Sequence, residues 1–188
     1  PLNHYPKKFF EIENILSFKN YSESYDSSAI KVCGAILDIK ERSNKDGRKY
    51  AFVTVSEINS QYELSIFSEN LSKYRPLLKE GNLLIFDIDI ILNNNDPRFV
   101  IREIKKLESE FNNLEKKIDI FIEPDQLIEY RDSLFSRKPN LKSKISIFIN
   151  IDNKLINFNS NSKYSLMSYK QLDMLKNSKK LDYNIDIS

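Results

Sequence analysis

The stretch IKVCGAILDIKERSNKDGRKYAFVTVSE, residues 30–57, is the most informative part of the sequence about its fold. On both sides of a short basic segment, apolar residues alternate with polar ones, which is the period of a half-buried β-strand. The segment between them contains Asp46 and Gly47, a pair that favours a tight hairpin turn. The stretch therefore predicts two antiparallel strands joined by a positively charged loop.

Each of these two strands has an expected inward face. The first is expected to bury Cys33, Ala35, Leu37 and Ile39, and the second Ala51, Val53 and Val55. Gly34 interrupts the other face of the first strand, at a position that favours a bulge or a sharp bend. Tyr50, Phe52 and Thr54 are left on the open face of the second strand. Two aromatic side chains thus directly follow the basic loop.

The following segments predict three more strands and one helix. QYELSIF supplies a third strand with Leu64 and Ile66 inward. SENLSKYRPLLKEG predicts a short helix with Ser68 as its N-cap and Gly81 at its end. NLLIFDIDIIL and RFVIREIKKLES are the fourth and fifth strands. Five strands with the helix between the third and the fourth predict an OB-fold, a small partly open β-barrel, over residues 30–108.

The remaining segments complete a β-rich α+β organisation. Residues 1–29 predict a short amphipathic helix, over 9–18, followed by a polar linker. Residues 109–116 predict a second, charged linker. Residues 117–188 predict the order βαββαβ, with Pro124 in the first turn of the first helix. We expect this C-terminal part to be a small separate α+β docking domain.

Composition limits the classes of function. The chain has 29 basic and 27 acidic residues and a net charge of only +2, so any nucleic-acid site is expected to be local. One cysteine, Cys33, and one histidine, His4, argue against a disulfide framework or a metal site, and we expect no cofactor. No signal peptide or membrane segment is predicted, which, together with the single cysteine, favours a reducing cytoplasm. The sequence lacks an initiator methionine, so it is expected to be a piece of a longer protein.

The basic loop and the strand after it predict a site for single-stranded nucleic acid. Asp46 faces four basic side chains, which leaves the loop a net charge of +3. The four are Arg42, Lys45, Arg48 and Lys49. This charge attracts phosphates, while the rings of Tyr50 and Phe52 can stack on bases, at roughly 1 to 3 kcal/mol per base. Lys31 and Arg98 are expected as outer phosphate contacts, because Arg98 follows the second loop that flanks the binding face of an OB barrel.

A purely structural interpretation of these residues stays open. Lysine-rich hairpin turns are common in soluble proteins, and aromatic residues are favoured in strands for packing reasons alone. Phe67, at the end of the third strand, is assigned to the core on this ground. The combination of charge with aromatic rings favours binding, with modest affinity because few phosphates are neutralised.

Two blocks of this sequence, GRKYAFVTV and LLKEGNLL, occur together in a known family. They resemble the OB domain of the bacterial DNA polymerase III alpha subunit, the C-family replicative polymerase, and the start PLNHY is similar to the His-Pro-Leu-x-x-Tyr element that precedes that domain. The resemblance implies a C-terminal fragment of a replicative DNA polymerase that lacks the polymerase carboxylates. It implies an OB domain that contacts single-stranded template DNA, and a C-terminal domain that binds the tau subunit of the clamp loader.

A weaker motif lies in the second predicted helix of the C-terminal domain. QLDML resembles the pattern by which replication proteins bind the sliding clamp. Its candidate contact residues are Gln171, Leu172, Met174 and Leu175. Because Leu172 and Leu175 also suit the core face of that helix, a packing role is favoured.

Two other functions compete with this interpretation. An anticodon-binding OB domain of a class II aminoacyl-tRNA synthetase also stacks strand aromatics on bases, although the βαββαβ tail argues against it. A small phosphoesterase would use paired carboxylates such as Asp87 and Asp89, which share one strand face. The same alternation is typical of a solvated strand, and no further catalytic motif accompanies it.

Overall fold

The computed structural model describes residues 2–18, 29–93, 96–136, 143–159, 165–166 and 169–187. It divides into two compact units, Pro1–Glu110 and Phe111–Ser188. The first unit contains η1 (Leu2–His4), α1 (Lys7–Ile12), β1 (Ala29–Ser43), β2 (Lys49–Ser56), β3 (Gln61–Phe67), α3 (Ser68–Tyr74), β4 (Leu83–Asn93) and β5 (Asp96–Lys106). The predicted linker over 21–28 and residues 94–95 of the predicted loop lie outside the described residues.

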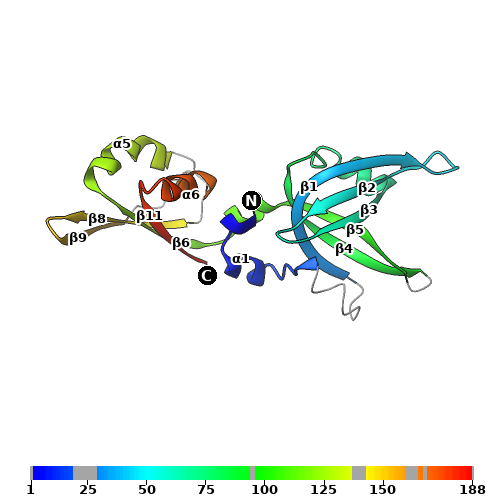
Figure 1. The fold of residues 1–188 in the computed structure, drawn as a ribbon, viewed down its shortest axis with the longest axis horizontal. Helices are drawn as coiled ribbons and strands as arrows, with labels where there is room; N and C mark the ends of the chain where they lie inside the picture. Colours follow the sequence, from blue (N-terminus) through cyan, green and yellow to red (C-terminus); the bar gives the residue numbers. More distant parts are fainter. Residues whose placement is uncertain are drawn as a thin grey trace. The chain divides into compact units, whose positions relative to one another are not determined.

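Strands β1 to β5 form a closed barrel in the order β1-β2-β3-β5-β4 (Figure 1). Neighbouring strands are antiparallel except β3 and β5, which are parallel where Ser65 lies opposite Val100. The inward residues of β2 and β3 are the expected ones, and Val53, Leu64 and Phe86 have no exposed surface. The five-stranded OB-type barrel predicted from the order of elements is confirmed.

The predicted inward face of β1 is wrong at Leu37, whereas Cys33 is buried and Ile39 packs against the core as predicted. Ile30, Val32 and Ile36 enter the barrel core, whereas Leu37 is 41% exposed. The register with β2 shifts between Ile36 and Asp38, and this bulge changes which residues point inward. A simple period of two cannot anticipate a strand that bends to pair with both β2 and β4.

Gly34 permits this bend. A Cβ atom at this position would lie 2.4 Å from Val55 Cγ1 and 2.6 Å from the carbonyl oxygen of Ser56. Only a residue without a side chain lets β1 and β2 approach so closely. Cys33, next to it, is buried as expected, and the Tyr62 hydroxyl donates a hydrogen bond to its carbonyl oxygen at 3.1 Å.

Two helices of the first unit begin or end at residues other than those predicted. The helix expected over 9–18 is α1, which ends at Ile12, because Asn14 adopts a left-handed conformation (φ 53°) and the amide of Ile15 bonds back to the Phe10 carbonyl at 2.8 Å. This is a Schellman-type end. Phe67, rather than Ser68, is the N-cap of α3, and no side chain caps that helix.

Residues 15–18 lie along the barrel instead of continuing α1. The Leu16 amide donates to the Lys31 carbonyl at 2.9 Å, and the Phe18 amide donates to Glu57 Oε2 at 3.2 Å. The Phe18 ring stacks on Tyr62, with centroids 4.0 Å apart. The N-terminal segment therefore contributes an aromatic side chain to the barrel core.

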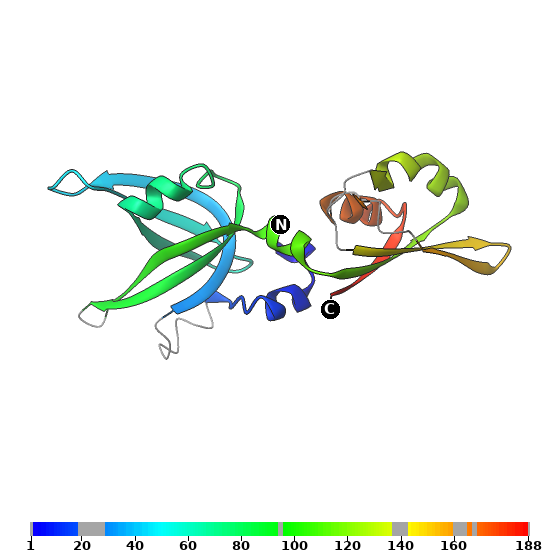
Figure 2. The same ribbon diagram turned by 180° about the vertical axis from the view of Figure 1, so that it is seen from behind.

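The second unit is built on a four-stranded sheet in the order β11-β6-β8-β9. It contains β6 (Lys116–Ile122), α5 (Pro124–Leu134), β7 (Phe135–Ser136), β8 (Ser143–Ile151), β9 (Lys154–Asn159), β10 (Ser165–Leu166), α6 (Tyr169–Asn177) and β11 (Asp182–Ile187). Helices α5 and α6 lie on the same side of the sheet, as both views show (Figures 1 and 2). The predicted βαββαβ order is confirmed, with the short β7–β10 ladder added to it.

The predicted charged linker over 109–116 is largely helical. Helix α4 (Leu107–Asn113) begins directly after β5, and the division between the two units falls within it. The buried Lys116 ammonium donates hydrogen bonds to the carbonyls of Phe111 and Leu114, the second at 3.1 Å. These bonds satisfy carbonyl groups near the end of α4 and explain why a charged stretch is ordered here.

Candidate nucleic-acid interface

The loop between β1 and β2 is held by one asparagine. Asn44 Oδ1 accepts hydrogen bonds from the amides of Asp46 at 3.0 Å and Arg48 at 2.8 Å. Gly47 has a φ of 76°, and its amide donates to the Asn44 carbonyl at 3.0 Å. With its backbone groups bonded internally, the loop leaves the side chains of Lys45 and Arg48 exposed to solvent.

The open face of β2 and β3 carries three aromatic rings. Tyr50 lies opposite Phe67 in the antiparallel register, and Phe52 lies opposite Ser65. The Tyr50 and Phe52 rings are 5.6 Å apart and nearly perpendicular, while the Tyr50 and Phe67 rings are 6.5 Å apart. Tyr50 and Phe52 are half-buried, and Phe67 is 42% exposed. All three lie on the outside of the barrel wall.

A cavity of about 490 Å³ brings these rings together with basic side chains. Its cations are Arg48, Lys49 and Arg98, and its rings are those of Tyr50, Phe52 and Phe67. The remaining lining residues are Asn44, Ser65 and Ser68. Since none of the described lining residues is acidic, the cavity combines positive potential with aromatic surface, which is the chemistry of single-strand binding.

The other predicted contacts are distributed differently. Arg42 lies opposite Tyr50 on β1 and is exposed, but it does not line the cavity. Lys31 does not reach it either, because its ammonium forms an ion pair with Glu13 at 3.4 Å and its backbone lies opposite Asp87 of β4. Lys31 is therefore part of the attachment of the N-terminal segment.

Phe67 is the lining residue that the sequence interpretation assigned to the core. The period of two in QYELSIF could have indicated the outward position of Phe67. Since Leu64 and Ile66 point inward, Phe67 must point outward with Glu63. Its position opposite Tyr50 depends on the register between β2 and β3, which only the structure gives.

Helix α6 of the second unit contains the clamp-like motif. Leu172 is buried and Leu175 packs against the core of this unit, whereas Gln171 and Met174 are exposed. The four residues do not form one surface, because the helix turns the leucines toward the sheet. This placement fits the packing role that the sequence favoured.

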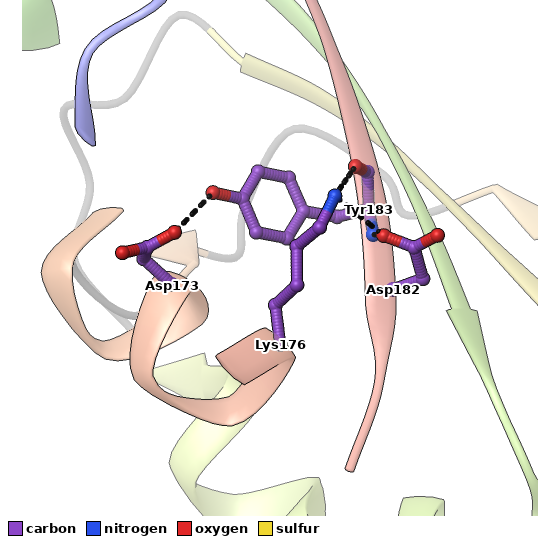
Figure 3. A network of polar contacts seen from close by, with 4 residues as sticks. All are labelled: Asp173, Lys176, Asp182 and Tyr183. Carbon is purple, nitrogen blue, oxygen red and sulfur yellow. Dashed lines mark hydrogen bonds and ion pairs between the residues drawn. The ribbon is translucent and has the colours of Figure 1, made fainter. Parts of the chain in front are cut away.

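A polar network attaches α6 to β11 (Figure 3). The Tyr183 hydroxyl donates to Asp173 at 3.4 Å, and the Lys176 ammonium lies 2.7 Å from Asp182 and 4.9 Å from the centre of the Tyr183 ring. The hydrogen bond from Lys176 lowers the pKa of the Asp182 carboxyl. The network fixes Lys176 and Asp182 at the rim of a second cavity.

This second cavity, of about 590 Å³, lies wholly within the second unit. Phe121 and Phe148 stack within it at 5.0 Å, and Leu155, which is 61% exposed, lies beside them. Its charged lining residues are Glu123, Lys176, Lys179, Lys180 and Asp182. Apolar rings bordered by mixed charge favour a protein side chain rather than a phosphate chain.

One of the carboxylates proposed for the phosphoesterase alternative already has a basic partner. Asp89 forms an ion pair with Arg102 at 3.4 Å, and the strand register shifts directly after Asp87. Across the described ranges, no group of three or more histidine, cysteine or acidic side chains is placed to hold a metal ion. In the same part of the chain, no helix has the length and apolar character needed to span a membrane.

Fold and cavity together define an OB-type barrel with an aromatic and basic face. The chain is also similar in sequence to one known protein. No family model matches the sequence. The chain is 24% identical to DNA polymerase III subunit alpha of Caulobacter vibrioides over 98 residues, which are 52% of this chain and 9% of that protein. The resemblance expected from the sequence is thus confirmed over about half of the chain.

Similar solved structures include a single-stranded DNA-binding protein and an OB-fold domain. The mitochondrial single-stranded DNA-binding protein Rim1 of S. cerevisiae has a TM-score of 0.37 and 18% identity, with 44% of this chain and 96% of that chain covered. The second OB-fold domain of replication protein A from Methanococcus maripaludis has a TM-score of 0.32 and 14% identity, with 43% and 84% covered.

Proposed function

We propose that the barrel binds single-stranded DNA in the cavity between the β1–β2 loop and the open face of β2 and β3. One observation carries the proposal: three aromatic rings and three cations line one cavity that has no acidic lining residue. The rings offer stacking surface to bases of any sequence, and the cations neutralise phosphates. Binding of this kind is independent of sequence and weakens with salt.

The likeness to a DNA polymerase III alpha subunit supports a role in DNA replication. On this proposal the chain is a non-catalytic part of a replicative polymerase, in the bacterial cytoplasm, and nucleotide transfer belongs to other parts of the longer protein. The barrel would guide single-stranded template rather than hold it firmly, because only three cations line the cavity.

We further propose that the second unit docks the tau subunit of the clamp loader, through the cavity around Phe121 and Phe148. The stacked rings and the exposed Leu155 offer an apolar contact of the kind that anchors protein interfaces. The proposal does not extend to the sliding clamp, since Leu172 and Leu175 of the candidate motif serve the core.

DNA binding is tested by titrating labelled oligo-dT with the full chain over a series of salt concentrations. Each stacking ring contributes about 1 to 3 kcal/mol, so Tyr50→Ala combined with Phe52→Ala is expected to weaken binding by about thirty-fold or more. Arg48→Ala is expected to flatten the salt dependence, whereas Lys79→Ala, an exposed lysine that does not line the cavity, serves as its control. Binding that ignores salt, or that the double variant leaves unchanged, excludes this site.

Docking is tested by co-elution of purified tau with the full chain. Leu155→Glu is expected to abolish the complex, because it places a carboxylate in the apolar part of the cavity. The matched control is Phe158→Glu, since Phe158 is also on β9 and is 53% exposed but does not line the cavity. No complex with the unmodified chain at about micromolar concentration, or equal loss in both variants, would refute the proposal.

A further inference from the structure

Strand β9 forms one edge of the sheet in the second unit. The sheet order is β11-β6-β8-β9, and within the described residues β9 pairs with β8 alone. Asp152 and Asn153, with φ of 50° and 61°, make the two-residue turn that holds β9 against β8 (Figure 1). In the described part of the chain, no strand pairs with the backbone groups on the other side of β9. These N–H and C=O groups can therefore accept a further strand.

The two edges of this sheet differ in how they are protected. The other edge strand, β11, carries the exposed charges of Asp182 and Asp186, and charged side chains are a common protection against pairing between edges. Strand β9 has no proline and a single charge, on Lys154 at its first position. All six of its residues are exposed, including Leu155 at 61% and Phe158 at 53%. These are the features of an edge that another strand covers.

The apolar face of the sheet continues onto β9. Ile156 lies opposite Ile149, and Phe158 lies opposite Ile147. Ile147 and Ile149 are buried in the core of the second unit, whereas Ile156 is 38% exposed. Paired residues share one face of a sheet, so the side chains of Ile156 and Phe158 extend the core face beyond the part that the helices cover.

The sequence of β9 is complementary to itself about Asn157. When two copies pair antiparallel around an axis at this residue, Ile156 of each copy lies opposite Phe158 of the other. Pairs of an aromatic with a β-branched residue stabilise antiparallel sheets. Asn157 lies opposite its own copy, and one amide can donate to and accept from another. Lys154 falls beyond the end of the opposing β9, so no like charges meet.

Other partners fit this edge less well. An axis at Ile156 would place Lys154 opposite Phe158, and a shift by one residue would turn the apolar side chains to the other face of the sheet. The single charge of β9 selects no acidic or basic peptide. A second β9 supplies both the apolar residues and the uncharged polar residues that the register about Asn157 requires.

We infer that β9 is a self-association surface, at which two copies of this chain join their four-stranded sheets through antiparallel β9–β9 pairing about Asn157. The contact is small, so the dimer is expected to be weak, with a Kd of roughly 10 to 100 µM. The inference is independent of the proposed DNA binding and docking. The docking experiment uses about micromolar chain, a concentration at which the monomer prevails.

The first test is sedimentation of the full chain from about 1 to 500 µM. The average mass is expected to rise from that of the monomer toward that of the dimer. Phe158→Glu is expected to weaken the dimer by about ten-fold or more, because it places a carboxylate against Ile156 of the other copy. The matched control is Met174→Glu, since Met174 is 60% exposed but lies on α6, and it should leave the dimer unchanged.

The second test fixes the register by disulfide formation under oxidised glutathione. Asn157→Cys is expected to link to its own copy, because opposite Cβ atoms are about 4.5 to 5.5 Å apart. Ile156→Cys is expected not to link to itself, since in this register it lies about 7 Å or more from its own copy. An equal mixture of Ile156→Cys and Phe158→Cys is expected to form the mixed dimer. Cys33 is buried and does not compete.

Three results would overturn the inference. A chain that stays monomeric at about 500 µM leaves the edge to a strand of another protein. A dimer that Phe158→Glu leaves intact, or self-linking of Ile156→Cys as strong as that of Asn157→Cys, would place the contact elsewhere. Growth beyond the dimer would exclude a closed two-fold contact. In each case the proposals for DNA binding and docking stand unchanged.

Discussion

Phe67 shows how one residue changes the interpretation of the barrel surface. Composition assigns an aromatic residue at the end of a strand to the core, yet the register places it opposite Tyr50 on the outside. Phe67 is 42% exposed and lines the cavity together with two other rings and three cations, so its ring is available to stack on a base. It is the strongest addition that the structure makes to the residues predicted from sequence.

Phe67→Ala is expected to weaken oligo-dT binding by about 1 to 3 kcal/mol, because one stacking ring is lost. Thermal unfolding should change little, since the side chain is outside the core. Phe67→Tyr is the control, because it keeps the ring and should retain most of the affinity. Full affinity in Phe67→Ala would remove this residue from the site.

Gly34 controls the shape of the barrel through a single missing side chain. Gly34→Ala would place a Cβ atom 2.6 Å from the Ser56 carbonyl oxygen, which belongs to the backbone and cannot rotate away. We expect a destabilisation of about 1 to 3 kcal/mol, measured by chemical denaturation followed by circular dichroism. Gly47→Ala tests the alternative that replacing any glycine of the barrel destabilises it to the same extent. It meets open space in an exposed turn, so its cost should come only from its positive φ.

Among the elements, β1 marks the limit of prediction from sequence. The number, order and type of the barrel strands follow from their periodicity and turn residues, and the side chains of β2 and β3 point as expected except that of Phe67. In β1, the bulge between Ile36 and Asp38 moves Leu37 outward and Ile36 inward. The bulge depends on how β1 pairs with its two neighbouring strands, and the residue pattern of β1 alone carries no information about that pairing.

Helix α4 gives a second example, because its charged sequence predicted a linker. The order of this segment depends on the buried Lys116, whose bonds to the carbonyls of Phe111 and Leu114 lie at the helix end. Such a tertiary contact to the backbone leaves no periodic signal in the sequence. The position of Arg98 could not be predicted from the sequence for a similar reason. Arg98 lines the cavity because closure of the barrel brings β5 next to β3.

Lys116 also makes the second unit sensitive to pH. Burial lowers the pKa of its ammonium to about 8, from an ordinary value of 10.5. Between these values the unfolded chain binds more protons than the folded one, so the free energy of unfolding is expected to rise with pH over this window. Lys116→Met should flatten this rise, as measured by denaturation at several pH values. An identical slope in both proteins would contradict the assignment.

Across the whole molecule, the two units are expected to respond to alkaline pH in opposite directions. Burial raises the pKa of the Cys33 thiol to about 12, from 9.0, and Glu57 adds to the effect. Stability from this group is present below pH 9.0 and is lost as pH rises toward 12, because the folded state keeps a proton that the unfolded state releases. The loss is about 1.4 kcal/mol per pH unit at most.

The measurement compares the unmodified chain with Cys33→Ala between pH values of about 8 and 11. The unmodified barrel should lose stability more steeply than the variant, after the lower starting stability of the variant is subtracted. Hydrogen exchange of β2 and β6 amides separates the barrel from the second unit. Parallel slopes for the two proteins would show that Cys33 does not contribute.

Photo-crosslinking determines whether single-stranded DNA lies on the loop end of the β2–β3 face. Labelled oligo-dT is irradiated with the full chain, and the attached peptides are identified by mass spectrometry. Crosslinks are expected at Tyr50, Phe52 and Phe67, and both salt and Arg48→Ala are expected to reduce them. Crosslinks confined to the second unit, or to the outer face of β4 around Asp87, would contradict this placement of the DNA.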